Sequence, residues 1–377
     1  MTTTDGPPPP REGEAPPDPA GEPQPGDEPD GHTRLLRSRK RAWIIFGSAL
    51  ASLIGLIIIA AAVVPLPYVI LSPGRATAVD GVVMIEGTET FDPDGEVLFL
   101  TVSVSDRRPN AFRVLNGWLD DDIAVEPEDE ILGGLSRAEE RRINVILMNE
   151  SQVVAKKVAL ERLGYTVPAE AFEVGVVEPG SPADGTLEVG DEIVAVDGTP
   201  AVELVDLGDA VRARAPGDPA TLTVERDDET LEVVVVTRAA PDGAFEGQAQ
   251  LGVSTISRFA FPVDVEIDTG RVGGPSAGLA FTLTILDVLS TGELTGGKDV
   301  AVTGTIDIEG NVGRVGGVEQ KAVAARQAGA ELFLVPDGEG DEARSHAGDM
   351  EVVEVSNLDE AAAALMDAGG DPLPAPV

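Results

Sequence analysis

The residue with the clearest chemical potential is Ser276, in the segment Arg271-Val-Gly-Gly-Pro-Ser-Ala-Gly-Leu-Ala-Phe281. The small, apolar run after the Gly-Gly-Pro turn predicts the start of a helix, because proline is tolerated in a first helical turn. A hydroxyl there lies beside unpaired backbone N–H groups, which can stabilise an oxyanion. By itself the segment favours a plainer role, a helix-capping serine, so catalysis needs support from elsewhere in the chain.

A nucleophilic serine needs a base, and this chain offers few. Its two histidines are His32 and His346. His32 precedes a long apolar segment, which places it across a membrane from Ser276 if that segment spans one. His346 falls in a polar stretch that predicts a solvated loop, so we do not expect it to act as the base.

A lysine base must be desolvated, because a free ammonium is protonated at neutral pH. Lys321 alone has apolar neighbours and is favoured by elimination, although one lysine on a helix is more often a surface charge. The pair Lys156 and Lys157 is expected on an exposed face. The chain has five lysines: Lys40, Lys156, Lys157, Lys298 and Lys321.

The composition excludes several classes of partner and site. Among 377 residues, 66 are acidic and 27 basic, for a net charge of -39. We therefore expect no nucleic-acid partner, since phosphate binding needs clustered Lys and Arg. Cysteine is absent, which excludes disulfides and thiolate metal sites. We expect neither a metal nor a cofactor.

The first part of the chain predicts a membrane anchor. Residues 1–41 are rich in proline and acid and end in a basic cluster, so they predict a disordered tail. Residues 42–64 carry no charge and are long enough to cross a bilayer once. The preceding positive charges predict a cytoplasmic N-terminus, with the rest of the chain outside the cell membrane. A signal peptide cleaved near Ala60-Ala-Ala62 is the alternative, and the length of the apolar run favours a retained anchor.

The remaining chain alternates strand and helix patterns. Residues 69–105 predict half-buried strands, and Ser136 with Glu139 predicts a capping box at the start of a helix that Gly164 ends. From residue 261 onward, strands and helices alternate again, and the helix at 316–329 carries Lys321. These patterns predict a mixed α/β domain.

Residues 168–239 form a separate unit with a recognisable pattern. Gly-Ser-Pro-Ala at 180–183 is followed by Leu-x-x-Gly-Asp-x-Ile-x-x-Val-Asp-Gly at 187–198. This combination resembles a PDZ domain of the type found in bacterial proteases. PDZ domains bind an extended C-terminus at a sheet edge. The resemblance implies a peptide-binding turn at Val174, Gly175 and Val176, with Phe172 just before it; a PDZ unit that only packs or spaces is the alternative.

Four further motifs resemble the proteolytic domain of Lon proteases. They are Gly-Pro-Ser-Ala-Gly at 274–278, Thr-Gly-Thr-Ile at 303–306, Val-Gly-Gly-Val-x-x-Lys at 315–321 and Phe-Leu-Val-Pro at 333–336. Upstream, Met-Asn-Glu-Ser at 148–151 resembles a Lon helix. The resemblance implies Ser276 as nucleophile, Lys321 as general base, Thr303 as the residue that orients the lysine, and Glu150 near the site. The sequence departs from the Lon pattern at Gly273, where Lon usually carries an acidic residue.

The whole layout resembles the bacterial family of membrane-anchored proteases with a PDZ and a Lon-like domain. It implies an α/β (α+β) Lon-type domain, built from residues 69–166 and 241–368, with the PDZ domain inserted at 168–239 and a tail at 369–377. Lon domains commonly form rings, which leaves a homo-oligomer open. Lon also uses ATP, but the near P-loop at 292–299 has Asp299 where Ser or Thr is required, so we expect a plain loop there.

The expected function is an ATP-independent serine endopeptidase acting outside the cytoplasm. Its substrates would be proteins or peptides with exposed C-termini or flexible segments, because no unfolding motor is expected. The alternative is a catalytically idle Lon-like scaffold that serves as a PDZ adaptor, with Gly273 as the hint that the site is idle. A chaperone or receptor has no support beyond the PDZ resemblance.

Overall fold

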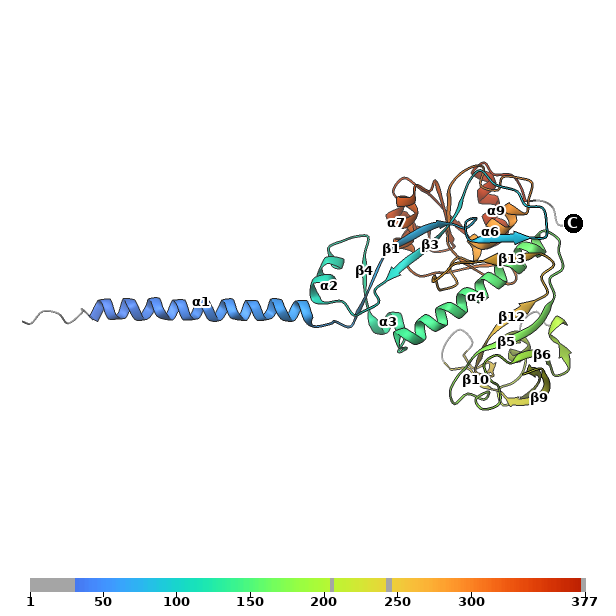
Figure 1. The fold of residues 1–377 in the computed structure, drawn as a ribbon, viewed down its shortest axis with the longest axis horizontal. Helices are drawn as coiled ribbons and strands as arrows, with labels where there is room; N and C mark the ends of the chain where they lie inside the picture. The colour runs from blue at the N-terminus through green and yellow to red at the C-terminus, as the bar shows by residue number, and fades with distance from the viewer. Residues whose placement is uncertain (1–30, 204–206, 242–245, 374–377) are drawn as a thin grey trace, which may run out of the picture. The chain divides into compact units, whose positions relative to one another are not determined.

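The computed structural model describes residues 31–203, 207–241 and 246–373, and separates into two units, Met1–Ala62 and Val63–Val377. The helix of the first unit, α1 (Gly31–Val63), contains Ile45–Val63, a stretch long and apolar enough to cross a membrane (Figure 1). It begins before the predicted span, because Arg, Lys and Leu residues in the basic cluster are good helix formers. Residues 31–41 of the predicted tail are part of α1, and residues 1–30 lie outside the described part.

The second unit is organised around a six-stranded sheet with the order β18-β17-β14-β3-β1-β4. Strand β14 lies parallel to both β3 and β17, so strands from before and after residues 168–239 share one sheet (Figure 1). The mixed α/β class predicted from the sequence is confirmed. The strands are β1 (Tyr68–Ala78), β3 (Val97–Val104), β4 (Ala124–Pro127), β14 (Val300–Val302), β17 (Leu332–Pro336) and β18 (Glu351–Val355).

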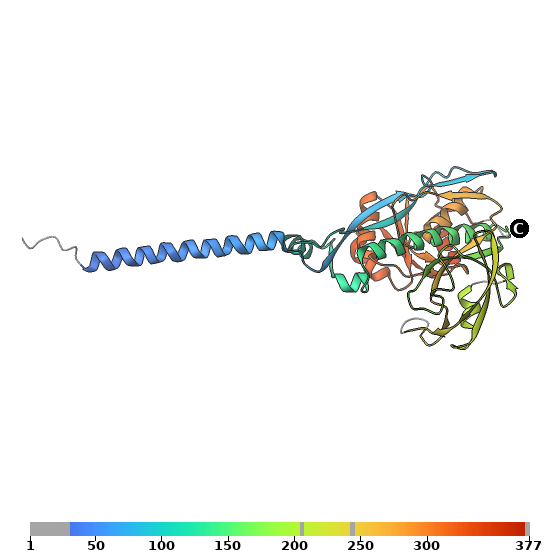
Figure 2. The same cartoon turned by 60° about the horizontal axis from the view of Figure 1, so that its bottom comes forward.

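Helices cover both faces of this sheet. Alternate strand residues point to opposite sides, and at the start of β3 both sets of side chains are apolar and buried. Leu98 and Leu100 pack with α7 and α8, whereas Val97 and Phe99 pack with α4, α6 and α9. The green helix in Figures 1 and 2 is α4. The covering helices are α4 (Arg137–Arg162), α6 (Gly278–Val288), α7 (Val318–Ala328), α8 (Gly340–Ala347) and α9 (Leu358–Asp367), and two short helices precede them, α2 (Ala111–Trp118) and α3 (Glu128–Leu132).

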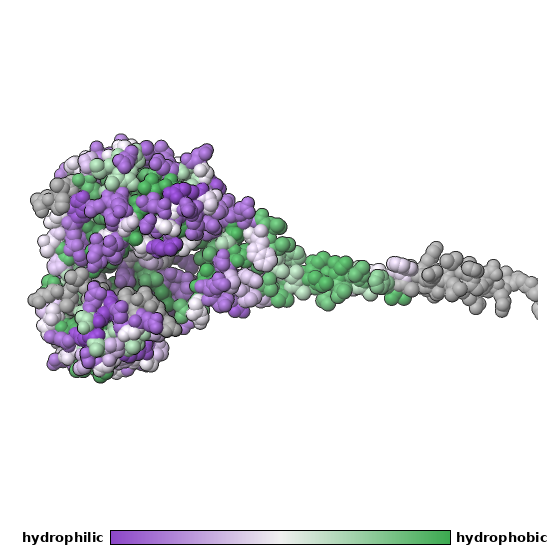
Figure 3. All heavy atoms as spheres, turned by 180° about the vertical axis from the view of Figure 1, so that it is seen from behind, coloured by the Kyte–Doolittle hydropathy of each residue, from purple (hydrophilic) through white to green (hydrophobic). Residues whose placement is uncertain are grey.

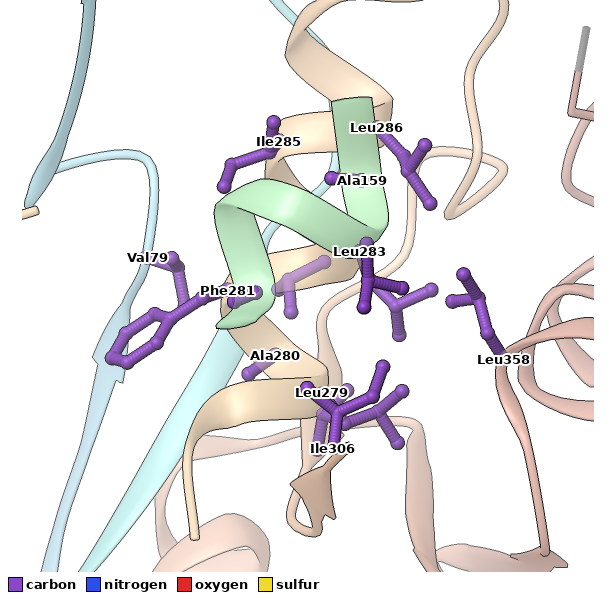
Figure 4. Close-up of a cluster of buried hydrophobic side chains, with 14 of the residues drawn as sticks. Val79, Ala159, Leu279, Ala280, Phe281, Leu283, Ile285, Leu286, Ile306 and Leu358 are labelled. Atoms are coloured by element: carbon purple, nitrogen blue, oxygen red, sulfur yellow. The ribbon is translucent and has the colours of Figure 1, made fainter. Parts of the chain in front are cut away.

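Helix α6 is the centre of the core, since every residue from Gly278 to Asp287 is buried. Its apolar side chains, including Phe281 and Leu283, pack against Ala159 of α4 and Leu358 of α9 (Figure 4). Helix α4 begins with the predicted capping box: Glu139 N donates to Ser136 Oγ, and Ser136 N donates to Glu139 Oε2. These contacts fix the two helices that flank the segment around Ser276.

A second sheet, with the order β12-β5-β6-β8-β9, encloses its own core of Phe172, Val174, Ile193 and Leu222. Its strands are β5 (Ala169–Val177), β6 (Glu192–Val196), β8 (Pro219–Arg226), β9 (Glu229–Val236) and β12 (Val253–Phe259), with β7 (Thr199–Pro200) beside β6. Helix α5 (Leu207–Arg212) follows the 3-10 turn at Ala201–Glu203. The short pairs are β2 (Val83–Glu86) with β13 (Asp264–Ile267), β10 (Arg238–Ala239) with β11 (Ala249–Gln250), and β15 (Thr305–Ile306) with β16 (Val312–Gly313).

Candidate active site

Ser276 and Lys321 line one cavity of about 550 Å³. Strand β3 supplies apolar residues to this cavity, and α4 supplies Asn144 and Met148. Two arginines, Arg271 and Arg314, also line it. The structure thus brings residues 45 positions apart in sequence (321 minus 276) to one site.

The segment that carries Ser276 is held in place by backbone contacts. Gly274 N donates to Asn144 O at 2.8 Å, Ser151 Oγ donates to Pro275 O at 3.0 Å, and Gly304 N donates to Ser276 O at 2.9 Å. Ser276 precedes Ala277, the N-cap of α6, which makes no side-chain cap bond. The capping role considered for Ser276 is therefore wrong. Its side chain is only partly buried, so a substrate can reach the hydroxyl.

Lys321 is buried inside α7, with 3% of its surface exposed. Its Nζ donates to Thr303 Oγ1 at 3.0 Å, and Thr303 Oγ1 donates to Ser276 O at 3.3 Å. One hydroxyl thus connects the lysine to the backbone of Ser276. Burial lowers the pKa of Lys321 to about 8, although the nearby Glu339 carboxylate acts in the opposite direction.

Among the described residues, no hydrogen bond joins Lys321 Nζ to Ser276 Oγ. Catalytic hydrogen bonds are often long in the absence of substrate and tighten in the complex. The assignment of this pair as a catalytic dyad therefore stays a prediction. The geometry does provide a desolvated amine, Lys321 Nζ, and an accessible hydroxyl, Ser276 Oγ, on residues that line the same cavity.

The other lysines and His346 lie elsewhere. His346 belongs to α8 rather than to a loop, and its Nε2 lies 3.0 Å from Asp121 O. The expectation of an exposed Lys156–Lys157 face is wrong, because both side chains pack on aromatic rings. Lys156 Nζ lies 4.8 Å from the Phe261 ring centre and donates to Val265 O. Burial lowers the pKa of Lys156 as well, but the residue does not line the cavity of Ser276.

Glu150 is partly buried and does not line this cavity either; Asn144 and Met148 of the same helix do. The next residue, Ser151, is the one that contacts the Ser276 segment. Glu150 lines a neighbouring cavity together with Ser151 and Pro275, and its supporting role stays a prediction.

The sequence did not point to Glu339, which lies 3% exposed at the start of α8. Its Oε1 accepts from Val315 N at 3.0 Å and from Arg314 Nε at 3.2 Å, so it holds the turn that leads into α7. The other oxygen, Oε2, is buried without a partner in the described part of the chain. An acidic residue soon after the strand Phe-Leu-Val-Pro was its only sequence signal.

The departure at Gly273 has a steric cause. A Cβ atom at this position would lie 3.0 Å from Asn144 Cβ and 3.3 Å from the Asn144 carbonyl. Because Gly274 also donates to Asn144 O, the backbone of α4 lies directly against this loop. A side chain at residue 273 would push the loop away from α4, so the glycine reflects close packing.

The peptide-binding residues expected in the second sheet lie in strand β5. Phe172 and Val174 are 1% and 0% exposed, and β5 pairs with β12 on one side and β6 on the other. Gly175 and Val176 belong to the same strand, which pairs with β12 from Ala169 to Val177 and with β6 at Phe172 and Glu173. Strand β12 is the edge strand, and a cavity of about 360 Å³ lies between its start and α5.

The segment at 292–299 is a loop, as expected, and is occupied by contacts within the protein. Lys298 Nζ donates to Ala368 O at 2.6 Å, and Glu293 Oε2 accepts from Asp94 N at 2.8 Å. A phosphate-binding lysine would need a free ammonium group, and this one is used to hold the chain after α9.

Comparison with known proteins confirms both resemblances. Residues 257–367 match the Lon protease (S16) C-terminal proteolytic domain, and residues 148–237 match the PDZ domain. A probable periplasmic serine endoprotease DegP-like from Pseudomonas fulva is 32% identical over 161 residues, 42% of this chain and 32% of that protein. A Lon protease from Methylocella silvestris is 36% identical over 126 residues, 33% of this chain and 15% of that protein.

The chain therefore spans about a third or less of the curated relatives it matches. Among solved structures, the PDZ domain of an SdrC-like protein from Listeria monocytogenes is similar at 21% identity, with a TM-score of 0.22, over 24% of this chain and 94% of that domain. A TM-score of this size adds nothing to the assignment.

Proposed function

We propose that this chain, which carries a Lon-type proteolytic domain and a PDZ domain, is a membrane-anchored serine endopeptidase that uses Ser276 and Lys321. The observation that carries the proposal is the buried Lys321, whose pKa lies near 8 and whose Nζ donates to Thr303 in the cavity of Ser276. An ordinary lysine would be charged at neutral pH, whereas this one is partly neutral and able to accept a proton.

The reaction proceeds in two halves. Neutral Lys321 Nζ takes the proton of Ser276 Oγ as that oxygen attacks the peptide carbonyl carbon. When the tetrahedral intermediate collapses, the C–N bond breaks and the leaving amine takes the proton from Lys321. Water then attacks the acyl-enzyme, with Lys321 as base again, and releases the carboxylate and Ser276.

Thr303 keeps the amine in position through this cycle. Its Oγ1 accepts from Nζ and donates its own hydrogen to Ser276 O, so the hydroxyl orientation is fixed. Thr303 and Lys321 are both buried, which favours a single arrangement of the contact between them. The lone pair of neutral Nζ stays available because the contact with Thr303 uses only an N–H bond.

The oxyanion would be stabilised by the start of α6. In the described part of the chain, the backbone N–H groups of Ser276 and Ala277 donate to no protein acceptor. Free N–H groups before a helix provide hydrogen bonds and a favourable dipole for developing negative charge.

Substrate selection is assigned to the edge strand β12 and helix α5. Residues from Gln250 to Thr255 line the cavity there, together with Leu207 and Val211. An extended C-terminal segment could add to this edge by main-chain hydrogen bonds while an apolar side chain enters the cavity. Substrates would thus be chains with exposed C-termini or flexible segments.

The membrane anchor would be α1, with the second unit outside the cytoplasm. Its support is the apolar stretch Ile45–Val63 and the basic residues that precede it. ATP independence is supported by Lys298, which is engaged with the Ala368 carbonyl. The contrary idea of an idle adaptor rested on Gly273, and the packing of Asn144 gives that glycine a structural reason.

The proposal is tested by incubating the full chain, in detergent and without ATP, with a mixture of unstructured peptides. Mass spectrometry should detect cleavage products that Ser276→Ala no longer forms. The matched control is Ser290→Ala. Ser290 is a buried serine just after α6, and its Oγ donates a hydrogen bond to Leu286 O of that helix. Equal cleavage by wild type and Ser276→Ala would contradict the role of Ser276 as nucleophile. No cleavage by any folded preparation would favour the adaptor.

A further inference from the structure

Helix α2 exposes an apolar face that the protein core does not use. Phe112, Leu115, Trp118 and Leu119 are 48%, 52%, 61% and 78% exposed, and we call these four residues the α2 face. Residues at this spacing share one side of a helix. The opposite side is anchored by Val114 and Gly117, which are buried; a Cβ atom at Gly117 would meet Val125.

The α2 face lies close in the structure to the residues that follow α1. Asn110, the N-cap of α2, forms a bridge with Pro65, and Leu66 N donates to Pro109 O at 2.8 Å. The Trp118 and Tyr68 rings meet edge to face with their centres 6.1 Å apart. Because α1 ends at Val63, the residues that contact the start of α2, Pro65 and Leu66, follow the candidate span within three positions.

Two arginines lie on the N-terminal side of the α2 face, whereas Asp120, Asp121 and Asp122 follow its last residue. Arg107 and Arg113 line a cavity of about 500 Å³ together with Asp106, Ser103 and Ser105. Within the described residues neither arginine forms an ion pair, whereas Arg108 pairs with Glu128 at 2.5 Å. In a chain with a net charge of -39, two unpaired arginines beside an apolar face mark a local site for anionic groups.

We propose that the α2 face, with Arg107 and Arg113, docks on the anionic lipid surface of the membrane in which α1 is anchored. The inference rests on the proposed anchoring and adds to it a second, surface contact. The apolar side chains enter the boundary between headgroups and acyl chains, while the arginines bind lipid phosphates.

The choice of a bilayer over a second copy of the chain follows from composition and position. The chain has two tryptophans and two tyrosines. Trp43 and Tyr68 flank the candidate span in the sequence, and the Trp118 ring packs on that of Tyr68. Trp and Tyr are enriched at membrane interfaces. Figure 3 shows apolar residues (green) at the N-terminal end of the second unit.

Docking has a consequence for the active site. Val104, at the end of β3, lines both the arginine cavity and the cavity of Ser276. A bilayer held at the α2 face would therefore lie near one end of the active-site cavity. Chain segments close to the membrane surface would have the shortest path to Ser276.

The experiment uses the full chain with Trp43→Phe, which leaves Trp118 as its single tryptophan. The protein is reconstituted into vesicles of phosphatidylcholine with phosphatidylglycerol, in which the lipids carry bromine at a shallow acyl position. We expect Trp118 emission to fall by about half or more, as for an interfacial residue. The double variant Leu115→Asp, Leu119→Asp should lose this quenching and keep its cleavage of soluble peptides.

The arginines are tested in the same assay. Arg107→Gln with Arg113→Gln should weaken quenching in anionic vesicles, and the matched pair Arg141→Gln with Arg142→Gln, exposed on α4, should not. Vesicle flotation separates the two proposals: failure to float contradicts the anchor, whereas flotation without quenching of Trp118 overturns the docking. The docking is also overturned if Trp118 emission is unquenched but blue-shifted and the shift grows with the number of protein molecules per vesicle. A second copy of the chain, rather than lipid, would then cover the α2 face.

Discussion

Lys321 Nζ lies 3.0 Å from Thr303 Oγ1, and both residues are almost fully buried. The same hydroxyl contacts the carbonyl of Ser276, so Thr303 links α7 to the segment before α6. This contact fixes where the amine lies without neutralising it by a carboxylate. It explains how the chain can keep a lysine with a pKa near 8 beside a reachable serine.

Replacing Thr303 should therefore impair turnover more than binding. We expect Thr303→Val to lower kcat about tenfold to a hundredfold with little change in KM, because the amine loses a positioning acceptor. Thr303→Ser should restore most of the rate. Thr284→Val on α6 is the control, since Thr284 Oγ1 is buried and has no hydrogen-bond partner among the described residues, so its loss should be neutral. Equal kcat for Thr303→Val and wild type would show that the contact does not orient the base.

The pH dependence should follow Lys321. As its neutral form is the base, kcat/KM should rise with pH through about pH 8. Glu339 favours the charged form, so Glu339→Gln should move the inflection to lower pH, while the exposed Glu331→Gln should leave it in place. An inflection that moves upward in Glu339→Gln would contradict this account.

The free energy of unfolding should also depend on pH through Lys321. The folded pKa lies below the usual value of 10.5, so between about pH 8 and 10.5 the unfolded state binds more protons. The contribution of Lys321 to the free energy of unfolding should therefore increase as pH rises through this window. Urea unfolding of wild type and Lys321→Met at several pH values measures how much Lys321 contributes to the free energy of unfolding. A contribution that does not change between about pH 8 and 10.5 would contradict a lowered pKa in the folded state.

The packing at Gly273 predicts that the acidic residue common in Lon would be harmful here. Gly273→Asp should destabilise the loop by about 1–3 kcal/mol and reduce kcat/KM, because its Cβ meets Asn144. Gly81→Asp is the control, since a Cβ there meets only Ala78 O, at 3.7 Å. Thermal unfolding and peptide cleavage check both variants. Higher activity in Gly273→Asp would revive the idea that the wild-type site is idle.

The core of α6 should be costly to change. Phe281 is completely buried, and its ring centre lies 5.9 Å from that of Phe99. Phe281→Ala should lower the free energy of unfolding by about 3–5 kcal/mol, and Phe281→Leu by less, because a smaller cavity forms. A loss below about 1 kcal/mol in urea unfolding of Phe281→Ala would contradict the central position of this helix.

The sequence allowed much of the site to be predicted, because local motifs carry residue type and order. Ser276, Thr303 and Lys321 each stand in a distinctive glycine-rich motif, and the apolar neighbours of Lys321 favoured it over the other lysines. The α4 capping box was also predictable, since both partners lie within one turn.

Features that depend on contacts distant in sequence were not predictable. Glu339 matters because it reaches Val315, 24 residues earlier, and the sequence around it gives no sign of that contact. Strand β5 has the pattern of a half-buried strand, which does not tell whether it lies inside a sheet or at its edge. Lys156 was misjudged because the Phe261 ring that covers it comes from another part of the chain.

The central claim is that a desolvated Lys321, rather than any buried lysine, activates Ser276. The most direct measurement is kcat for a peptide substrate in Lys321→Met, beside the matched Lys156→Met, which removes the other lysine whose pKa burial lowers. The account predicts a loss of at least about a hundredfold in Lys321→Met and near wild-type turnover in Lys156→Met, with both variants folded. Retained turnover in folded Lys321→Met would contradict it.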